Sequence, residues 1–195
     1  YSPKRAKQIG VACAYQDLSL CTNLSVYENF AMLNVSHGLI SSPGWRKEAK
    51  ENAKALLEKY FPGSNIDVTK PIETLSLTDR QVVEICKTLM ADHLKILILD
   101  EPTSALSSDK AEQLHKIVAE LSEKGVAVIY ISHKLDEIRK VSDRIVMLTN
   151  GQNRGEFYSD EITQEELIMH MGGASEKKER VARDFSENED MLTIT

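Results

Sequence analysis

Two adjacent carboxylates follow the apolar run at residues 96–99, which has the composition of a buried strand. Asp100 and Glu101 therefore stand at the carboxyl end of a strand, the edge at which open α/β sheets bind their ligands. One carboxylate can hold Mg²⁺ through its oxygens, and the next can orient or deprotonate an attacking water. A strand that leaves the core through an acidic turn without function would have a similar sequence. The Pro-Thr pair and the helix pattern that follow disfavour this alternative.

Three further polar residues stand at the ends of predicted elements. His133 follows the apolar run 126–131, so its imidazole would share the sheet edge of the carboxylates, where it could bond a γ-phosphate or position water. Gln16 ends the first apolar run, and its neutral amide can ligate Mg²⁺ or water without adding charge. Ser76 precedes the helix predicted at 78–90, where free backbone N–H groups favour an anion. Taken singly, these are also ordinary features: a loop histidine, a surface amide and a helix N-cap.

Four short apolar runs rich in Val and Ile indicate strands that are covered on both faces, as in parallel sheets. They lie at residues 9–15, 96–99, 126–131 and 145–148. Between the second and third, apolar residues at helical spacing predict a helix that Gly125 ends, which makes a β-α-β unit with a right-handed crossover. We expect all four runs in one mainly parallel sheet.

A helical block is expected between the first and second strands, where no strand pattern occurs. Helices are predicted at 26–33, 45–60 and 78–90. Two more are predicted at 135–141 and 163–171, the last with Thr163 as its N-cap and Glu166 as the capping-box partner.

The composition excludes several classes of protein. The 195 residues are 42% hydrophobic and 28% charged, which is ordinary for a globular domain. The net charge of −6 disfavours a protein that binds nucleic-acid phosphates or a polybasic membrane anchor. No apolar run is long enough for a transmembrane helix. Three scattered cysteines form no disulfide framework and indicate a reducing, cytoplasmic compartment.

The composition changes near the C-terminus. Ten of the seventeen residues at 174–190 are charged, which predicts a solvated linker. Residues 191–195 then alternate like the opening of a strand. We therefore expect one domain at 1–173 with a helical subdomain at about 24–91, a linker at 174–190, and the start of a following domain at 191–195.

Four groups of residues stand in a fixed order along the chain. They are Tyr15-Gln16-Asp17-Leu18-Ser19-Leu20 with Asn23-Leu24-Ser25-Val26, Leu75-Ser76 with Val83-Glu84-Ile85, the run 96–106, and Ile131-Ser132-His133-Lys134-Leu135-Asp136-Glu137. Together they resemble the Q-loop, signature, Walker B with D-loop, and H-loop of the ATP-binding subunits of ABC transporters. The chain looks most like the first cassette of tandem-cassette ATPases for ribose-, galactose- or xylose-type sugar import. The resemblance runs from about residue 9 to 173. It implies a P-loop NTPase-like α/β fold with a mainly parallel sheet and an inserted helical subdomain.

The resemblance also implies roles for the candidate residues, with ATP and Mg²⁺ as cofactors. Asp100 would bind Mg²⁺, Glu101 would be the general base for water, and His133 would contact the γ-phosphate. Gln16 would sense the nucleotide, help to hold Mg²⁺ and link to the membrane subunit. Ser76 would reach across a head-to-tail dimer to the partner's nucleotide.

The implied function is that of the ATP-hydrolysing, energy-coupling subunit of a sugar importer, peripheral on the cytoplasmic face of the membrane. Its partners would be a transmembrane permease, a second ATP-binding cassette in the same chain or a dimer, and indirectly a periplasmic or extracellular sugar-binding protein, but no nucleic acid. Alternatives are a non-catalytic interaction module and a soluble ABC-type ATPase of translation or DNA repair. The last is disfavoured because the helical block has no sustained heptad and the linker is acidic.

The sequence departs from the family pattern in two places. Thr78 and Asp79 stand where the signature usually has Gly or Ala and then Gln. No G-x-x-x-x-G-K-[ST] occurs in the chain, and the family carries that phosphate-binding loop ahead of the Q-loop strand. The chain therefore resembles an N-terminally truncated member, and we expect it to bind ATP weakly by itself.

Overall fold

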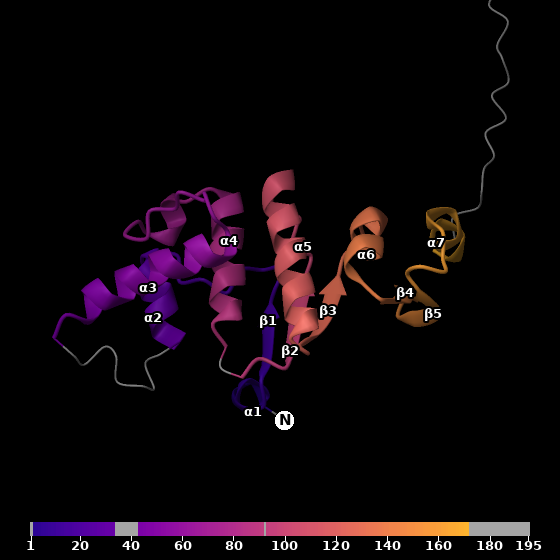
Figure 1. The fold of residues 1–195 in the computed structure, drawn as a ribbon, viewed down its shortest axis with the longest axis horizontal. Helices are drawn as coiled ribbons and strands as arrows, with labels where there is room; N and C mark the ends of the chain where they lie inside the picture. The colour runs from indigo at the N-terminus through magenta and orange to yellow at the C-terminus, as the bar shows by residue number, and fades with distance from the viewer. Residues whose placement is uncertain (1, 34–42, 92, 172–195) are drawn as a thin grey trace, which may run out of the picture.

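The computed structural model describes residues 2–33, 43–91 and 93–171. A small parallel sheet lies at the centre, with a group of helices on one side along the long axis and a hairpin with two short helices on the other (Figure 1). The elements in chain order are α1 (Pro3–Gln8), β1 (Val11–Ala14), α2 (Val26–Ala31), α3 (Trp45–Tyr60), the 3-10 turn η3 (Ile72–Thr74), α4 (Leu77–Leu89), β2 (Ile96–Asp100), α5 (Ser108–Glu123), β3 (Ala127–Ile131), α6 (Leu135–Val141), β4 (Arg144–Thr149), β5 (Gln152–Tyr158) and α7 (Gln164–His170).

The central sheet has the order β1-β2-β3, and both pairings are parallel. Val11 pairs with Ile96, which in turn pairs with Ala127, so the three strands run in register from the same starting edge. The helix α5 forms the crossover between β2 and β3, as expected for a β-α-β unit. The α/β class, the parallel sheet and the helices inserted between β1 and β2 are thus confirmed.

The prediction that the run 145–148 joins this sheet is wrong. Its strand β4 pairs antiparallel with β5 in a separate two-stranded sheet. The connection is the two-residue turn Asn150-Gly151, in which both residues have positive φ, 52° and 74°. That conformation suits the right-handed twist of a hairpin, and Asn-Gly is its strongest short-range signal. A tight turn therefore gives β4 a neighbour directly after it in the chain.

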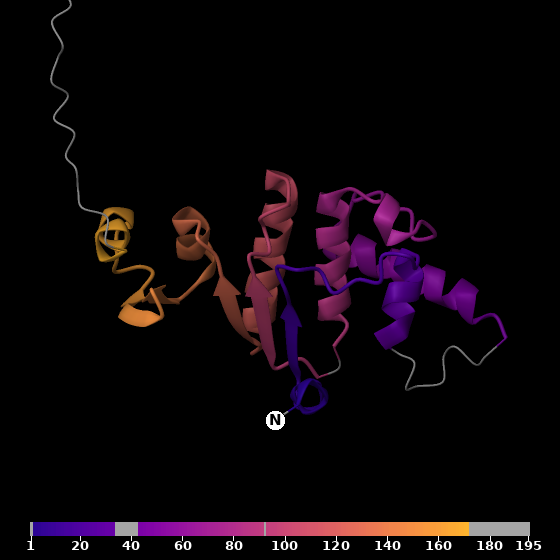
Figure 2. The ribbon, with the colours of Figure 1, turned by 180° about the vertical axis from the view of Figure 1, so that it is seen from behind.

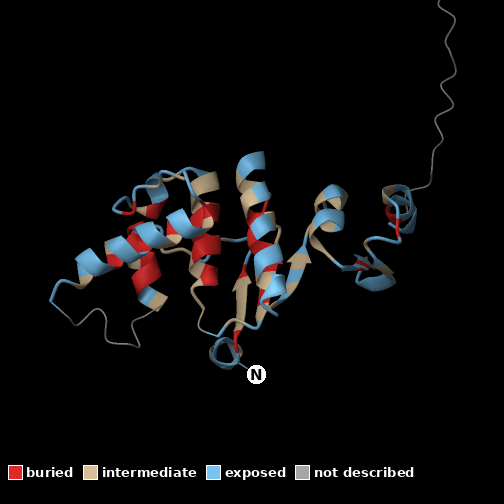
Figure 3. Cartoon of the chain, viewed as in Figure 1, coloured by how far each residue is buried: buried red, intermediate tan, exposed pale blue. Residues whose placement is uncertain are grey.

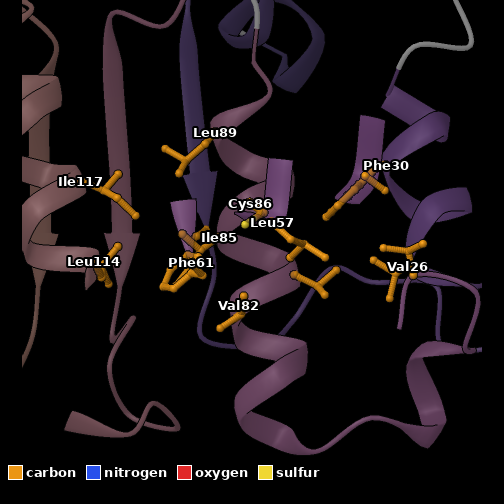
Figure 4. Packing of buried hydrophobic residues seen from close by; sticks show 14 of the residues in the cluster. Val26, Phe30, Leu57, Phe61, Val82, Ile85, Cys86, Leu89, Leu114 and Ile117 are labelled. Atoms are coloured by element: carbon orange, nitrogen blue, oxygen red, sulfur yellow. The ribbon is translucent and has the colours of Figure 1, made fainter. Parts of the chain in front are cut away.

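The main core fills the space between the sheet and the helices. Residues of α2, α3 and α4 pack against one another and against Leu114 and Ile117 of α5 (Figure 4). The buried positions concentrate on the inner faces of α2 and α4, while the outer side of α3 is exposed (Figure 3). The helical block and the sheet therefore share one continuous core. A second, smaller cluster of Ile145, Met147, Ile162 and Leu167 lies under the hairpin and α7.

The sheet is covered on only one face within the described residues, so the expectation of strands buried on both faces is wrong for β3. Leu97 and Leu99 of β2 point into the core, whereas Ile129 and Ile131 of β3 are 51% and 47% exposed. The view from behind shows the strands with no helix in front of them (Figure 2). We call this surface of β1, β2 and β3 the open face.

Gly10 allows the start of β1 to approach the chain that leads into β2. Its φ is +91°, and a Cβ at this position would collide with the backbone oxygen of His93. The carbonyl of Gly10 accepts hydrogen bonds from the backbone N–H groups of Lys95 and Ile96, at 2.7 and 3.0 Å. A residue without a side chain is therefore needed for this close backbone contact.

Two expectations concern the described helices and the C-terminal segment. In the described residues, no helix combines the length and the apolar character needed to cross a bilayer. The linker predicted at 174–190 and the strand start at 191–195 lie outside the described residues.

Candidate functional site

The ends of the three parallel strands bring four of the five candidate residues to one edge of the sheet. Asp100 is the last residue of β2 and pairs with Ile131, the last residue of β3, two residues before His133. Gln16 follows β1, whose last residue pairs with Leu99. Because parallel strands end at a common edge, the register places these residues along one edge of the sheet.

Glu101 and His133 are in direct contact. The Oε1 atom of Glu101 lies 2.7 Å from Nδ1 of His133 and also accepts a hydrogen bond from the His133 backbone N–H at 3.1 Å. The Glu101 side chain is 15% exposed, whereas that of His133 is 74% exposed. The other carboxylate oxygen, Oε2, is buried and has no hydrogen-bond partner among the described residues. The Glu101 carboxylate is thus fixed through Oε1 beside an exposed imidazole, and a carboxylate held in this way can act as a base.

The backbone of Glu101 is itself unusual. Its φ is +47°, in the left-handed region that costs a residue with a side chain about 1–2 kcal/mol. The backbone N–H of Glu101 donates to the carbonyl of Ile131 at 2.9 Å, which ties the turn to the end of β3. Strained backbone held by its surroundings is often found at functional sites.

A second polar cluster, formed by Thr103, Tyr130, Lys134 and Glu137, supports this turn from behind. The buried Thr103 hydroxyl donates to Oε2 of Glu137 at 2.6 Å, and Tyr130 donates to the same oxygen at 3.2 Å. Lys134 Nζ lies 3.1 Å from the other oxygen of Glu137 and 3.3 Å from the carbonyl of Thr103. Burial opposes ionisation of Glu137, but hydrogen bonds from Thr103 and Lys134 outweigh it and lower the pKa of this carboxyl.

This cluster is the part of the site that the sequence reasoning missed. Lys134 and Glu137 belong to the segment that carries the family resemblance, but no role followed from their spacing. The three-residue spacing places both side chains on the same side of the first turn of α6. The threonine partner is more than thirty residues earlier in the chain, so the contact depends on the pairing of β2 with β3.

Ser76 lies at the same end of the molecule but on the helical block. The helix α4 runs against the direction of β2, so its N-terminus is near the strand ends (Figure 1). Ser76 caps this helix, as its oxygen accepts from the backbone N–H of Asp79 at 3.1 Å and its hydroxyl donates to the Asp79 carboxylate at 2.7 Å. The Asp79 carboxylate is thus held at the N-terminus of α4, where the helix dipole favours negative charge.

The two unusual signature residues both contact the chain around α5. Asp79 pairs with Lys110 at 3.0 Å, so its added negative charge is neutralised within the molecule. The Thr78 hydroxyl donates to the carbonyl of Ala105 at 2.6 Å and joins α4 to the loop that follows Glu101. The substitutions therefore connect the helical block to the site.

The fit of the site to Mg²⁺ depends on Asp100 and Gln16. Asp100 is partly buried at the end of β2, and Gln16 is exposed after β1, so both can offer oxygen atoms, the type of ligand that Mg²⁺ prefers. In the described ranges, no three His, Cys, Asp or Glu side chains gather in a way that would hold a metal without help. Two protein ligands of this kind would suit a Mg²⁺ ion that takes most of its other ligands from phosphate and water.

The fold is that of an ATP-binding cassette. The structure of a dimeric post-hydrolysis state of the ATP-binding cassette MJ0796, bound to ADP and Pi, aligns with a TM-score of 0.66, over 82% of this chain and 68% of that one. The sequence identity is 22%, so this likeness concerns the fold.

A family model described as ABC transporter matches residues 2–104, more than half of the chain. The chain belongs to the ABC transporter family.

Its curated relatives are named as sugar-import proteins. A ribose import ATP-binding protein, RbsA, of Clostridium perfringens (strain SM101 / Type A) is 33% identical over 191 residues. That match covers 98% of this chain and 38% of the relative. A xylose import ATP-binding protein, XylG, of Moorella thermoacetica is 39% identical over 175 residues, which cover 89% of this chain and 33% of the relative. The chain thus spans about a third of the length of these relatives.

Proposed function

We propose that the chain is part of the ATP-hydrolysing, energy-coupling subunit of an ABC importer for sugars. Its partners would be a transmembrane permease and a second ATP-binding cassette, with a periplasmic or extracellular sugar-binding protein acting indirectly. The assembly would place the chain on the cytoplasmic face of the membrane. The sugar-import roles in the names of its relatives support this proposal.

The observation that carries the proposal is the contact between Glu101 and His133 at the ends of β2 and β3. Hydrolysis of a phosphoanhydride needs a base beside the attacking water and a donor near the γ-phosphate. The Glu101 carboxylate, 15% exposed at the strand edge, can take the proton, and the exposed imidazole of His133 can donate to the phosphate. The bond between the two side chains orients both groups.

Asp100 and Gln16 would hold Mg²⁺ together with the nucleotide. The ion supplies positive charge that offsets the charge of the phosphates when it is bound. Asp100 adds a carboxylate and Gln16 an uncharged carbonyl, so the protein part of the site keeps a single negative charge. Asp100 and Glu101 are adjacent at a strand end, which lets one hold the cation while the other acts on water.

Ser76 would serve the nucleotide of a facing cassette from the N-terminus of α4. Lys110 supports this role because it neutralises Asp79, which would otherwise repel a phosphate. We also propose the division into a domain at 1–173 with a helical subdomain at about 24–91, a linker at 174–190 and a following domain from 191.

The test compares Glu101→Gln with Asp100→Asn in the complete gene product. The glutamine keeps the size of Glu101 but removes the base, so ATP should still bind while turnover falls by about a hundredfold or more. The asparagine should weaken nucleotide binding and its dependence on magnesium together. Hydrolysis, nucleotide affinity and melting temperature are measured for both variants.

Two outcomes would contradict the proposal. Hydrolysis at the parental rate in Glu101→Gln would show that Glu101 is not the general base. A loss of melting temperature in both variants with no change in nucleotide affinity or turnover would assign both carboxylates to the stability of the turn. In that case the chain would be a non-catalytic interaction module.

A further inference from the structure

A buried carboxylate lies outside the site described above. Glu84, in the middle of α4, is 1% exposed, and its Oε2 atom has no hydrogen-bond partner among the described residues. It borders a cavity of about 250 Å³ between α4, β1 and the segment that follows β1. The polar residues lining this cavity are Lys7, Cys13, Ser19, Glu84, Lys87 and Thr88. Burying a carboxylate costs free energy unless hydrogen bonds offset it. The hydrogen-bond partners of Glu84 therefore indicate which part of the structure this carboxylate holds.

The partner of Glu84 is Ser19, 65 residues earlier in the chain. The Ser19 hydroxyl donates to Oε1 of Glu84 at 2.6 Å. Lys87, one turn further along α4, donates to the carbonyl of Ser19 at 2.7 Å and to its hydroxyl at 3.1 Å. Each polar group of Ser19 apart from its backbone N–H is therefore held by a charged side chain of one helix. Hydrogen bonds to charged groups are about twice as strong as neutral ones.

These contacts join two parts of the candidate site that are far apart in the sequence. Ser19 follows Gln16 by three residues, on the segment that leaves the strand edge. Glu84 lies eight residues after Ser76 on α4, about 12 Å along the helix at 1.5 Å per residue. A helix of this length transmits displacement at one end to the other because its backbone is hydrogen-bonded throughout. The contacts of Ser19 thus join the segment that carries Gln16 to the helix that Ser76 caps.

We propose that Glu84 and Lys87 are positioning residues that hold the Gln16 segment, through Ser19, in a fixed place relative to the N-terminus of α4. This inference rests on the proposed function, since it concerns how one nucleotide-contacting residue is aligned with another. Glu84 and Lys87 are not among the residues proposed above to contact the nucleotide. Their role is to let a change at Gln16 move Ser76, and a change at Ser76 move Gln16.

The charges support a positioning role over simple packing. An exposed segment such as that of Ser19 needs no buried carboxylate to pack against a helix, and an apolar side chain would fill the position of Glu84 at lower cost. Lys87 Nζ is 4.0 Å from the unpartnered Oε2 of Glu84, so the two charges offset each other while both bind Ser19. The contacts of Glu84 and Lys87 thus fix the position of Ser19 relative to α4.

The experiment measures ATP hydrolysis by the complete gene product with Ser19→Ala, Glu84→Gln and the double variant. Thr88→Val is the matched control, because the Thr88 hydroxyl is buried on the same helix and donates at 2.9 Å to the carbonyl of Glu84 without touching Ser19. We expect Ser19→Ala to lower kcat about fivefold or more, the scale of ordinary coupling between sites, with the KM for ATP and the melting temperature near wild type. Ser19→Thr, which keeps the hydroxyl, should restore kcat.

The double variant should lose little more than Ser19→Ala alone, because both changes break the same contact. An unchanged kcat in Ser19→Ala, or an equal fall in Ser19→Ala and Thr88→Val, would overturn the positioning role alone. Wild-type hydrolysis in the same assay tests the proposed function, and its absence would overturn both proposals.

Discussion

Glu101, the proposed base of the site, has a backbone conformation that costs free energy. Its left-handed φ of +47° is unfavourable for a glutamate, yet the turn that contains it places Oε1 on His133. The hydrogen bond from the Glu101 N–H to Ile131 and the Thr103–Glu137 contact hold this turn in place. The strain is thus balanced by contacts that connect β2, β3 and α6.

Replacing Glu101 by glycine and by alanine separates this strain from the loss of the side chain. Both variants lose the contact with His133 equally, so this loss cancels in the comparison. Only glycine accepts the left-handed φ freely, so Glu101→Gly should be more stable than Glu101→Ala by about 1 kcal/mol. Chemical denaturation of both variants measures the difference. Equal stability, or a more stable alanine variant, would show that the backbone of Glu101 is unstrained.

At the residue level, the sequence predicted which side chains meet but not how they bind. Asp100, Glu101 and His133 share an edge because strand ends in a parallel sheet do so, and this follows from two apolar runs and a crossover helix. The direct bond between Glu101 and His133 depends on one positive φ, which no pattern of residue types marks at a glutamate. The support from Thr103 and Glu137 required the register of β2 with β3.

At the level of elements, the strongest predictions came from capping and periodicity. The helix at 45–60 has the predicted bounds, and α7 has the predicted capping box, in which Glu166 accepts from the Thr163 N–H at 2.8 Å. The fourth apolar run failed as a sheet member because four apolar residues do not specify a partner strand. Its partner β5 follows Asn150-Gly151, a dipeptide that is typical of two-residue hairpin turns and therefore indicates this pairing.

Two glycines with similar φ values test how closely β1 approaches the chain before β2. Gly10 and Gly125 have φ of +91° and +83°, but a Cβ meets the His93 carbonyl only at Gly10 and finds open space at Gly125. Gly125→Ala should cost about 1 kcal/mol from backbone strain, and Gly10→Ala about 2 kcal/mol more from the collision. Melting curves of the two variants provide the comparison. Equal losses would mean that the chain near His93 moves aside easily.

On the scale of the whole molecule, the described residues leave the open face of the sheet without cover, unlike the sheet of a compact α/β domain. Parallel sheets are normally covered on both faces, because their strands carry apolar side chains on each side. Here Ile129 and Ile131 reach solvent, while Tyr130 between them packs on the core side with α5. The apolar pattern of β3 was recognised in the sequence, but which of its faces is covered depends on the rest of the fold.

The open face should make the chain associate with itself at high concentration. Exposed apolar surface of this kind favours contact between molecules. Replacing both Ile129 and Ile131 by Thr keeps β-branched residues in the strand and should reduce association without a large change in melting temperature. Light scattering over a range of concentrations measures this. Val128→Thr, on the core side, is the control and should lower stability instead; unchanged association in the double variant would contradict the prediction.

The pairing of β1 with β2 has a consequence for the order of events during synthesis. Val11 finds its partner only when Ile96 has left the ribosome, about 85 residues later, which takes about 4–17 s at ordinary elongation rates. During that interval α2, α3 and α4 emerge in sequence and can pack on one another through contacts close in the chain. The nascent chain must therefore keep β1 without its partner β2 while the helices between them take shape.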